Sequence, residues 1–258
     1  MASFGKLDKD LHLQVYENVE ELSDSLAEHV AQLSASAVKD RGAFTVVLSG
    51  GSLIKTLGKL CEPPYLHTVD WGNWHVFWVD ERVVKKDHPD SNYKLAYDGF
   101  LSKVPIPSEK VYAINDTLSA QGAAEDYEFG LKQLVKTGIL ATADTNDYPR
   151  FDLLLMGMGP DGHCASLFPN HPLVHVKEKW VASITDSPKP PPERITFTLP
   201  VIQAAANIFF VANGEGKAEM VAKVFGEELP FGQLPSQSAR PTNGKLIWFA
   251  DKGAASKL

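Results

Sequence analysis

Cysteine and long apolar runs are both scarce in this chain of 258 residues. The two cysteines, Cys61 and Cys164, form no C-x-x-C pair, which excludes a disulfide-stapled scaffold and gives no sign of a zinc or redox site. No apolar stretch approaches the ~18 residues that cross a bilayer, and the start, MASFGKLDKD, lacks the basic and apolar regions of a secretory leader. We therefore expect a cytoplasmic protein that does not associate with membranes.

Basic residues are in deficit, because 25 Lys and Arg residues face 32 Asp and Glu residues, for a formal net charge of -7. A nucleic-acid partner requires a basic surface, so none is expected, although a local basic pocket for a small anion remains open. The hydrophobic share of 44% and the charged share of 22% are typical of a folded globular protein. The length allows two small domains or one large one. Because no internal repeat or convincing linker occurs, we predict one domain over residues 1–258.

Common catalytic signatures are missing as well. The serine-nucleophile motif G-x-S-x-G does not occur, and no cysteine is paired with a histidine in a recognisable way. The histidines other than His163 are too scattered to indicate a metal site. The residues therefore favour water activated by a base over covalent catalysis, without a metal.

The chain does contain a regular alternation of short apolar segments and amphipathic ones. Periodicity predicts strands over 11–16, 44–48, 75–79, 111–114, 153–156, 180–184, 195–199, 208–211 and 246–249. It predicts helices over 18–42, 53–60, 93–104, 120–136 and 217–224. This order implies right-handed crossovers and an α/β fold whose mostly parallel sheet is covered on both faces, with a frayed tail at 252–258.

Four polar loops each follow directly after a predicted strand. They are SGGS at 49–52, DER at 80–82, GMGPDGH at 157–163 and GEGK at 214–217. The carboxyl ends of parallel strands lie at one edge of a sheet, and ligands bind there. We therefore predict that these loops line a single ligand site.

The segment FDLLLMGMGPDGHCASLF, residues 151–168, is the expected centre of that site. A strand buried on both faces leads into a loop in which Gly157, Gly159 and Gly162 allow a sharp turn and a close approach to a ligand. The loop carries His163, whose pKa lies near working pH, and Asp161, which can orient the ring. A general base is the functional interpretation, and an ordinary loop histidine is the alternative.

Two nucleotide-binding motifs are nearly matched, and both are excluded. GMGPDG fits the dinucleotide fingerprint G-x-G-x-x-G, but Asp161 would face the cofactor's pyrophosphate, and Pro169 and Pro172 prevent a long helix from starting there. Gly216 and Lys217 fail as a P-loop, because an alanine follows where Ser or Thr is needed. No cofactor is expected.

Groups that bind phosphate are predicted in two places. The N–H groups and hydroxyls of the SGGS loop would face an anion at the start of a helix, whereas a plain turn is the alternative. Lys217 and Arg194 are expected to supply a cationic clamp, and solvated surface charge is the alternative for each.

Several segments quoted above, together with Ser91-Asn92, Arg194-Ile195-Thr196 and the extended run GMGPDGHCASLFP, stand in an order that is similar to that of a known family. They resemble the 6-phosphogluconolactonases of the glucosamine-6-phosphate isomerase/6-phosphogluconolactonase family. The resemblance implies a Rossmann-like three-layer α/β/α fold. It also implies hydrolysis of 6-phospho-D-glucono-1,5-lactone to 6-phospho-D-gluconate in the oxidative pentose phosphate pathway, without cofactor. The oligomeric state stays open, and a monomer is the simplest expectation.

The resemblance implies roles for individual residues. His163 would be the general base, Asp161 would support it, and Arg82 would face the substrate. The substrate-binding positions that it carries over are Ser49, Gly50, Gly51, Ser52, Asp80, Gly162, Arg194 and Lys217. Of these, Ser52, Arg194 and Lys217 would hold the phosphate.

Two other functions are weighed against the lactonase. Glucosamine-6-phosphate deaminases resemble the chain in the same loops, but the glutamate of their signature is replaced here by Phe168, and an apolar ring cannot carry a proton. The other is a non-catalytic sugar-phosphate sensor, which predicts an attached DNA-binding or interaction module. The N-terminal segment offers no basic recognition helix for that interpretation.

Overall fold

Six parallel strands form the central sheet of the structure, a computed structural model that describes residues 11–144 and 146–258. The strands lie in the order β1, β11, β10, β7, β2, β3, and every registered pair is parallel. Their bounds are Leu11–Tyr16 (β1), Phe44–Leu48 (β2), Trp74–Trp78 (β3), Leu153–Met156 (β7), Asn207–Ala212 (β10) and Lys245–Asp251 (β11). The predicted mostly parallel sheet is confirmed. The start of the chain, on which the expectation of no leader rests, lies outside the described residues.

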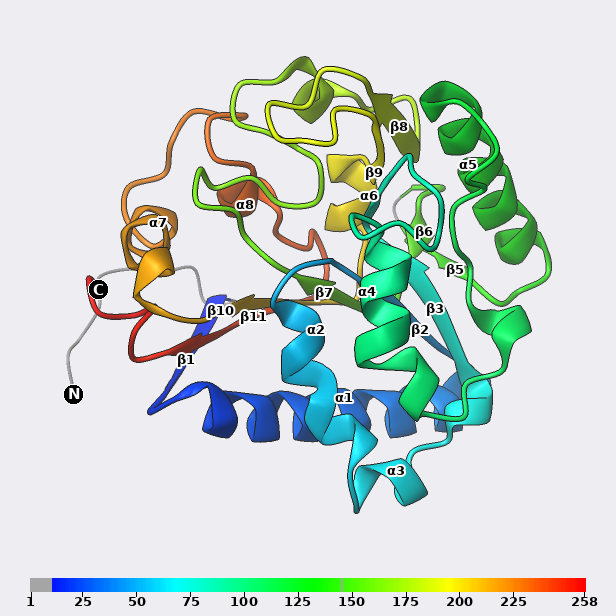
Figure 1. Ribbon diagram of the computed structural model, residues 1–258, viewed down its shortest axis with the longest axis horizontal. Helices are drawn as coiled ribbons and strands as arrows, with labels where there is room; N and C mark the ends of the chain where they lie inside the picture. Colours follow the sequence, from blue (N-terminus) through cyan, green and yellow to red (C-terminus); the bar gives the residue numbers. More distant parts are fainter. Residues whose placement is uncertain (1–10, 145) are drawn as a thin grey trace.

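Helices cover both faces of this sheet and give the three layers visible in Figure 1. One face carries α1 (Val19–Arg41), α2 (Leu53–Thr56), α3 (Tyr65–Thr68) and α4 (Asn92–Gly99). The other carries α5 (Ala120–Lys136), α6 (Leu199–Gln203), α7 (Ala218–Val224) and α8 (Pro235–Ser238). The Rossmann-like three-layer α/β/α prediction is confirmed.

Short 3-10 helices and one small hairpin complete the connections. The 3-10 helices are η1 (Leu57–Cys61), η2 (Trp71–Asn73), η3 (Leu101–Lys103), η4 (Ser108–Lys110), η5 (Pro172–His175) and η6 (Glu215–Lys217). The hairpin pairs β5 (Ala141–Thr142) with β6 (Pro149–Arg150). Within the described residues no helix is long and apolar enough to cross a membrane.

The inner strands of the sheet are mostly apolar because their side chains are buried in cores on both faces. Val46 and Leu48 of β2 pack on the side of α1, whereas Val47 between them packs on the side of α5. Helix α1 itself begins directly after a capping residue, since the Asn18 side chain accepts the N–H groups of Glu20 and Glu21, each at 3.0 Å.

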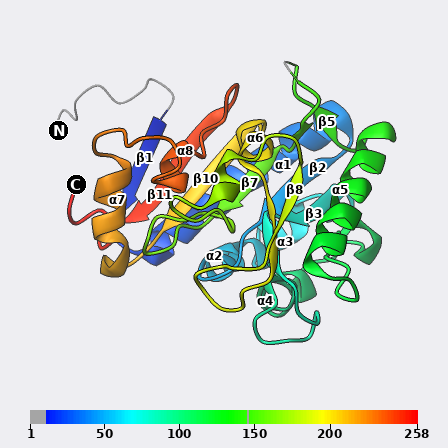
Figure 2. The same cartoon turned by 90° about the horizontal axis from the view of Figure 1, so that it is seen from above.

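A second, antiparallel sheet corrects the sequence prediction for two strands. β8 (Val181–Ile184) and β9 (Arg194–Phe197) pair with β4 (Asp80–Arg82) in the order β4, β9, β8 and do not join the main sheet. The connection over 185–193 is too short for a crossover that would return the chain parallel, so β8 and β9 must run antiparallel. Figure 2 shows this connection projecting toward the same edge of the main sheet as α2 and α4.

The predicted strand at 111–114 and the predicted frayed tail are also wrong. Residues 111–114 form a single parallel bridge, between Val111 and Val76, before the chain leaves the sheet edge. In the tail, Ala254 is fully buried and its N–H donates to the Asp251 carboxylate at 2.8 Å. A buried side chain and this hydrogen bond fold the tail back onto the end of β11.

A crevice is expected where neighbouring strands send their loops to opposite faces of the sheet. β2 and β7 are such neighbours. The chain after β2 enters α2 on the α1 side, whereas the chain after β7 continues into the core on the α5 side, with Cys164 and Leu167 buried there. The SGGS and GMGPDGH loops therefore flank one opening.

Candidate active site

A cavity of about 170 Å³ lies at this opening, at the carboxyl edge of the sheet. Nine of the predicted site residues line it: Ser49, Gly50, Gly51, Ser52, Asp80, Arg82, His163, Arg194 and Lys217. Asp161 and Gly162 do not line it and belong to the loop that carries His163. The four polar loops meet in one place, as the sequence predicts.

Backbone hydrogen bonds fold the loop after β7 into a tight turn that brings His163 back over the loop's own start. Gly162 N–H donates to the Gly159 carbonyl (3.0 Å), and Gly159 N–H donates to the His163 carbonyl (2.9 Å). Gly162 has a φ of 84°, in the region that favours glycine. A Cβ atom on Gly159 would lie 2.1 Å from the His163 ring, so the imidazole fits only because residue 159 has no side chain.

His163 and Asp161 form a hydrogen-bonded pair, with His163 Nδ1 2.5 Å from Asp161 Oδ1. Because an ionised carboxylate only accepts hydrogen bonds, Nδ1 carries the proton, and Nε2 of the neutral ring keeps a lone pair. Burial lowers the pKa of His163, although the hydrogen bond and charge of Asp161 oppose this. Burial acts most strongly on Asp161 and raises its pKa, but the hydrogen bonds and the charge of His163 together outweigh burial, so the pKa of Asp161 is lowered. At neutral pH a neutral imidazole therefore lies beside a carboxylate, and that imidazole can accept a proton.

Phe168 packs against the same imidazole, with the two ring centroids 4.7 Å apart. Its side chain is 1% exposed, and the Arg194 guanidinium lies 5.6 Å from its ring centroid. An apolar ring therefore occupies the neighbourhood of His163 where the deaminase signature has a carboxylate.

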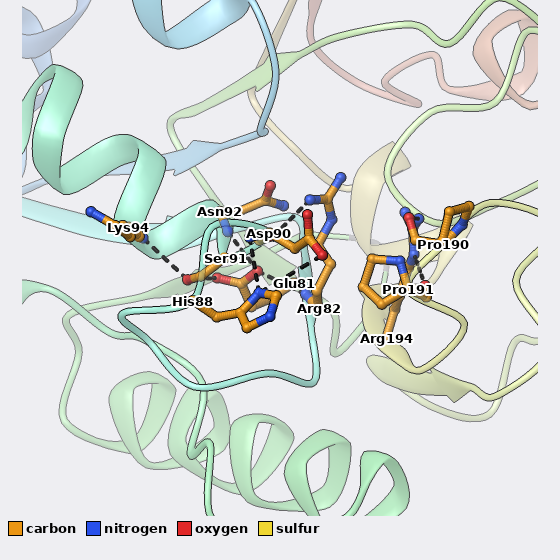
Figure 3. Close-up of polar contacts among 10 residues, drawn as sticks. All are labelled: Glu81, Arg82, His88, Asp90, Ser91, Asn92, Lys94, Pro190, Pro191 and Arg194. Carbon is orange, nitrogen blue, oxygen red and sulfur yellow. Dashed lines mark hydrogen bonds and ion pairs between the residues drawn. The ribbon is translucent and has the colours of Figure 1, made fainter.

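The triplet Asp80-Glu81-Arg82 divides its side chains between the cavity and the protein interior. Glu81 is 2% exposed, and its carboxylate accepts the N–H groups of Arg82 (2.7 Å), Asn92 (2.8 Å) and Tyr93 (2.7 Å), which fixes the start of α4. Figure 3 shows Glu81 together with Arg82 and Asn92. Burial raises the pKa of Glu81 to about 7, against the lowering effect of these N–H donors. Asp80 and Arg82 instead line the cavity.

Asp80 is connected to Arg194 through Ser166. The Ser166 hydroxyl donates to Asp80 Oδ2 (2.7 Å) and accepts from Arg194 Nη1 (3.4 Å). Ser166 and the cavity-lining Asn92 received no role from the sequence. The available signal was their place in motifs, Ser91-Asn92 and GHCASLF, because neither residue type is distinctive alone.

Arg194 is committed mainly to the connection between β8 and β9. Its side chain is 3% exposed, and Nε donates to the Pro191 carbonyl at 3.0 Å, while Nη2 donates to the carbonyls of Lys189 (2.9 Å) and Pro190 (3.1 Å). Figure 3 shows the guanidinium lying against Pro190 and Pro191. Arg194 therefore lines the cavity, but most of its donors hold the protein's own chain and are not available to a ligand.

The SGGS loop can bind an anion through its backbone N–H groups rather than through the Ser49 hydroxyl. The Ser49 hydroxyl donates to the Leu155 carbonyl of β7 (2.9 Å), so it can offer only lone pairs, which an anion does not accept. The Ser52 hydroxyl donates to Asn213 Oδ1 (3.2 Å), which joins this loop to the loop before η6. Among the described residues, the N–H groups of Gly51 and Ser52 have no backbone acceptor, so they are free to bind an anion.

Three cations line the cavity without a carboxylate partner in the part of the chain that the structure describes. Lys217 Nζ donates to the Met158 carbonyl (2.7 Å), Arg82 Nη1 donates to the Asp90 carbonyl (2.7 Å), and Arg194 holds the carbonyls described above. Burial lowers the pKa of Lys217 and of Arg194. Partly desolvated cations that form no direct ion pair are costly unless an anion binds beside them. In a chain of net charge -7 this arrangement indicates a site for an anionic ligand.

Proteins of known sequence and structure are similar to this chain over nearly all of its length. A protein from Oryza sativa subsp. indica named probable 6-phosphogluconolactonase 4, chloroplastic, is 60% identical over 245 residues, which are 95% of this chain and 76% of that protein. Probable 6-phosphogluconolactonase 1 from Arabidopsis thaliana is 55% identical over 250 residues, covering 95% of this chain and 93% of its own. The crystal structure of 6-phosphogluconolactonase from Leishmania guyanensis superimposes with a TM-score of 0.80 at 25% identity, over 94% of this chain and 97% of that one.

The model of the family described as glucosamine-6-phosphate isomerases/6-phosphogluconolactonase matches residues 17–248, which include the four cavity loops and every strand of the main sheet except β1 and the last residues of β11. With this match and relatives at 55–60% identity, the chain belongs to the glucosamine-6-phosphate isomerase/6-phosphogluconolactonase family.

Proposed function

We propose that this protein hydrolyses 6-phospho-D-glucono-1,5-lactone to 6-phospho-D-gluconate, the lactone-opening step of the oxidative pentose phosphate pathway. The single observation that carries the proposal is that His163, hydrogen-bonded to Asp161, lines the same cavity as Lys217, Arg82 and Arg194, three cations without carboxylate partners among the described residues. A base beside an anion site suits a substrate that carries both an ester bond, on which the base acts, and a separate phosphate, which the cations bind. The names of the relatives support the same substrate.

In the proposed mechanism, neutral His163 removes a proton from water through Nε2, and the resulting hydroxide attacks the lactone carbonyl carbon. Asp161 stabilises the imidazolium that forms, as a carboxylate hydrogen-bonded to Nδ1 does. The tetrahedral intermediate collapses by breaking the bond between the carbonyl carbon and the ring oxygen. His163 returns its proton to that oxygen, so the base is restored and a hydroxyl and a carboxylic acid are released.

Charge develops on the carbonyl oxygen in this step and needs a donor. Arg82 lines the cavity, and only its Nη1 donates to a described residue, the Asp90 carbonyl. We assign Arg82 to the developing oxyanion, where charge stabilisation lowers the barrier more than it improves binding. The phosphate is assigned to Lys217 and to the N–H groups of Gly51 and Ser52, which the contact between Ser52 and Asn213 brings to the same side.

Deamination of glucosamine 6-phosphate is the second function to be tested. It needs a proton-carrying group beside the histidine, and the buried Phe168 ring packs there instead. The lactonase is therefore favoured. A sugar-phosphate sensor without turnover is the third possibility, and a half-buried base whose Nε2 has no hydrogen-bond partner among the described residues serves no purpose in it.

One experiment separates the three functions. Purified protein is offered freshly made 6-phosphogluconolactone and, separately, glucosamine 6-phosphate, and the release of acid and of ammonia is followed against protein-free controls. Acid release above the spontaneous rate without ammonia supports the lactonase. Ammonia release would establish the deaminase, and binding with neither product would establish the sensor.

A monomeric state and a cytoplasmic location accompany this proposal. One relative's name includes a chloroplast and another names no compartment, so the location stays a prediction. Sedimentation of the purified protein and imaging of a tagged full chain test the two points.

A further inference from the structure

The connection between β8 and β9 is rich in proline but is tied down by hydrogen bonds. The Ser187 hydroxyl donates to the Lys189 carbonyl (2.8 Å), the Lys189 N–H donates to the Ser187 hydroxyl (3.2 Å), and the Ser187 N–H donates to the Pro192 carbonyl (3.2 Å). Arg194 adds three bonds to the consecutive carbonyls of residues 189–191. A buried guanidinium is costly unless its N–H groups are hydrogen-bonded, and here the carbonyls of this loop are the acceptors. These bonds therefore hold the loop in one conformation.

Lys189 lies in this hydrogen-bonded loop, and its ammonium is the group of interest. Its main chain is fixed by Arg194 and Ser187, while its side chain is half-buried and forms no ion pair with a carboxylate in the described residues. The charge of Lys189 disfavours the protonated forms of both His163 and Lys217, which belong to two different loops and line the same cavity. Lys189 is not itself among the residues that line the cavity, but its carbonyl accepts a hydrogen bond from Arg194 Nη2 (2.9 Å), and Arg194 does line the cavity, so residue 189 borders the cavity wall.

We propose that Lys189 is a fourth cation of the cavity, which recognises the substrate's phosphate together with Lys217, and that Arg194 is the positioning residue that holds it there. This inference rests on the proposed function, because it assigns a partner to the phosphate of that substrate. Lys189 and Lys217 repel each other when the cavity is empty, and a phosphate dianion between them removes that repulsion. The pair therefore selects phosphorylated lactones over neutral ones.

Lys189 also has a consequence for the base. A nearby cation favours neutral His163, the form that takes a proton from water. Removing the Lys189 charge raises the pKa of His163, so the fall of activity at low pH begins at a higher pH. A residue with a purely structural role would not move this profile.

The test compares Lys189→Met with Lys177→Met, the matched loss of an exposed lysine whose ammonium forms no hydrogen bond or ion pair with the described residues, and with Lys189→Arg, which keeps the charge. Both backbone bonds of residue 189 survive in all variants. For 6-phosphogluconolactone, Lys189→Met should raise KM about 10-fold or more with kcat within about twofold, as expected for a lost charge-assisted hydrogen bond. Lys177→Met should match the wild type, and Lys189→Arg should recover most of the affinity. The unphosphorylated D-glucono-1,5-lactone should be hydrolysed equally by all of them.

Two results would overturn the inference. The first is a KM for Lys189→Met within twofold of that for Lys177→Met. The second is an equal loss of kcat/KM for the phosphorylated and the unphosphorylated lactone, which would make the role of residue 189 structural. Titration with 6-phosphogluconate as a binding probe separates this inference from the proposed function. If the wild type does not hydrolyse the lactone, the proposed function fails, whereas weaker binding of 6-phosphogluconate to Lys189→Met than to Lys177→Met still supports the cation site. Equal binding to both variants rejects it.

Discussion

Replacing His163 with asparagine is expected to lower kcat about 10²–10⁴-fold, the range in which a positioned general base contributes. That factor corresponds to roughly 3–5 kcal/mol of transition-state stabilisation. Asparagine fills much of the same volume beside Phe168 but offers no lone pair of suitable basicity where Nε2 stood. The KM should change by less than about threefold, because the ring acts on water and the phosphate is held by other residues.

The assay follows acid release with a pH indicator in weak buffer, after the spontaneous opening of the lactone has been subtracted. His12→Asn is the matched control, since it makes the same change at an exposed histidine of β1. Thermal unfolding of both variants checks that the loop after β7 stays folded. A kcat for His163→Asn within tenfold of that for His12→Asn would refute the assignment of the base.

The pH profile gives an independent check on the same residue. The pKa of His163 is lowered by burial, so the neutral, active form persists below the ordinary histidine value near 6.5. The kcat/KM of the wild type should therefore be flat above about pH 6.5 and fall only below it. A midpoint above that value would contradict the geometry. Asp161→Asn should add little in the His163→Asn background, because Asp161 acts through the ring.

Three further changes test other parts of the structure. Lys217→Ala should raise KM about 10-fold or more with kcat largely kept, because a phosphate is bound similarly in ground and transition states; a loss confined to kcat would move Lys217 into the chemistry. Gly159→Ala places a methyl group 2.1 Å from the His163 ring, so kcat should fall well over 10-fold. The affinity for 6-phosphogluconate, measured as a probe of substrate binding, should change less. Wild-type turnover would show that the loop adapts freely to the methyl group. His75 is 5% exposed, its Nδ1 lies 3.0 Å from the Tyr112 hydroxyl, and burial lowers its pKa to about 4. Between about pH 6.5 and pH 4 the imidazole is therefore protonated in the unfolded chain but not in the folded one. The free energy of unfolding should fall by roughly 3 kcal/mol as the pH drops through this range. Urea unfolding across that range should show this slope in the wild type and a smaller one in His75→Phe, and identical slopes would exclude His75 as its source.

Local pattern was sufficient for the elements that surround the catalytic loop. Leu153–Met156 is apolar at every position because both faces of β7 are buried, and that leaves a readable signal in any window of sequence. The turn at Gly157, Gly159 and Gly162 and the spacing of Asp161 and His163 are likewise short-range features, so the pair and its loop were predictable. By the same logic the four polar loops could be placed at one edge before any contact was known.

Pairing partners were beyond local pattern. The strands at 181–184 and 194–197 look like any other half-buried strand, and only the position of Asp80–Arg82 beside them creates a second sheet. The segment at 111–114 is apolar enough for a strand, yet the chain makes one bridge at Val111 and departs toward α5. Strand identity depends on what lies alongside, which no short window contains.

The sequence by itself determined the pairing of His163 with Asp161, the cations, and the edge of the sheet at which they meet, because these follow from strand ends and from residues two positions apart. Only the tertiary structure decided how those groups are used. The Ser49 hydroxyl donates a hydrogen bond to the Leu155 carbonyl, and most N–H groups of Arg194 donate to the loop at 189–191, although the sequence assigned both residues to the substrate. The physical reason is that a hydrogen-bond donor serves whichever acceptor folding brings nearest. For Ser49 that acceptor lies more than a hundred residues away along the chain.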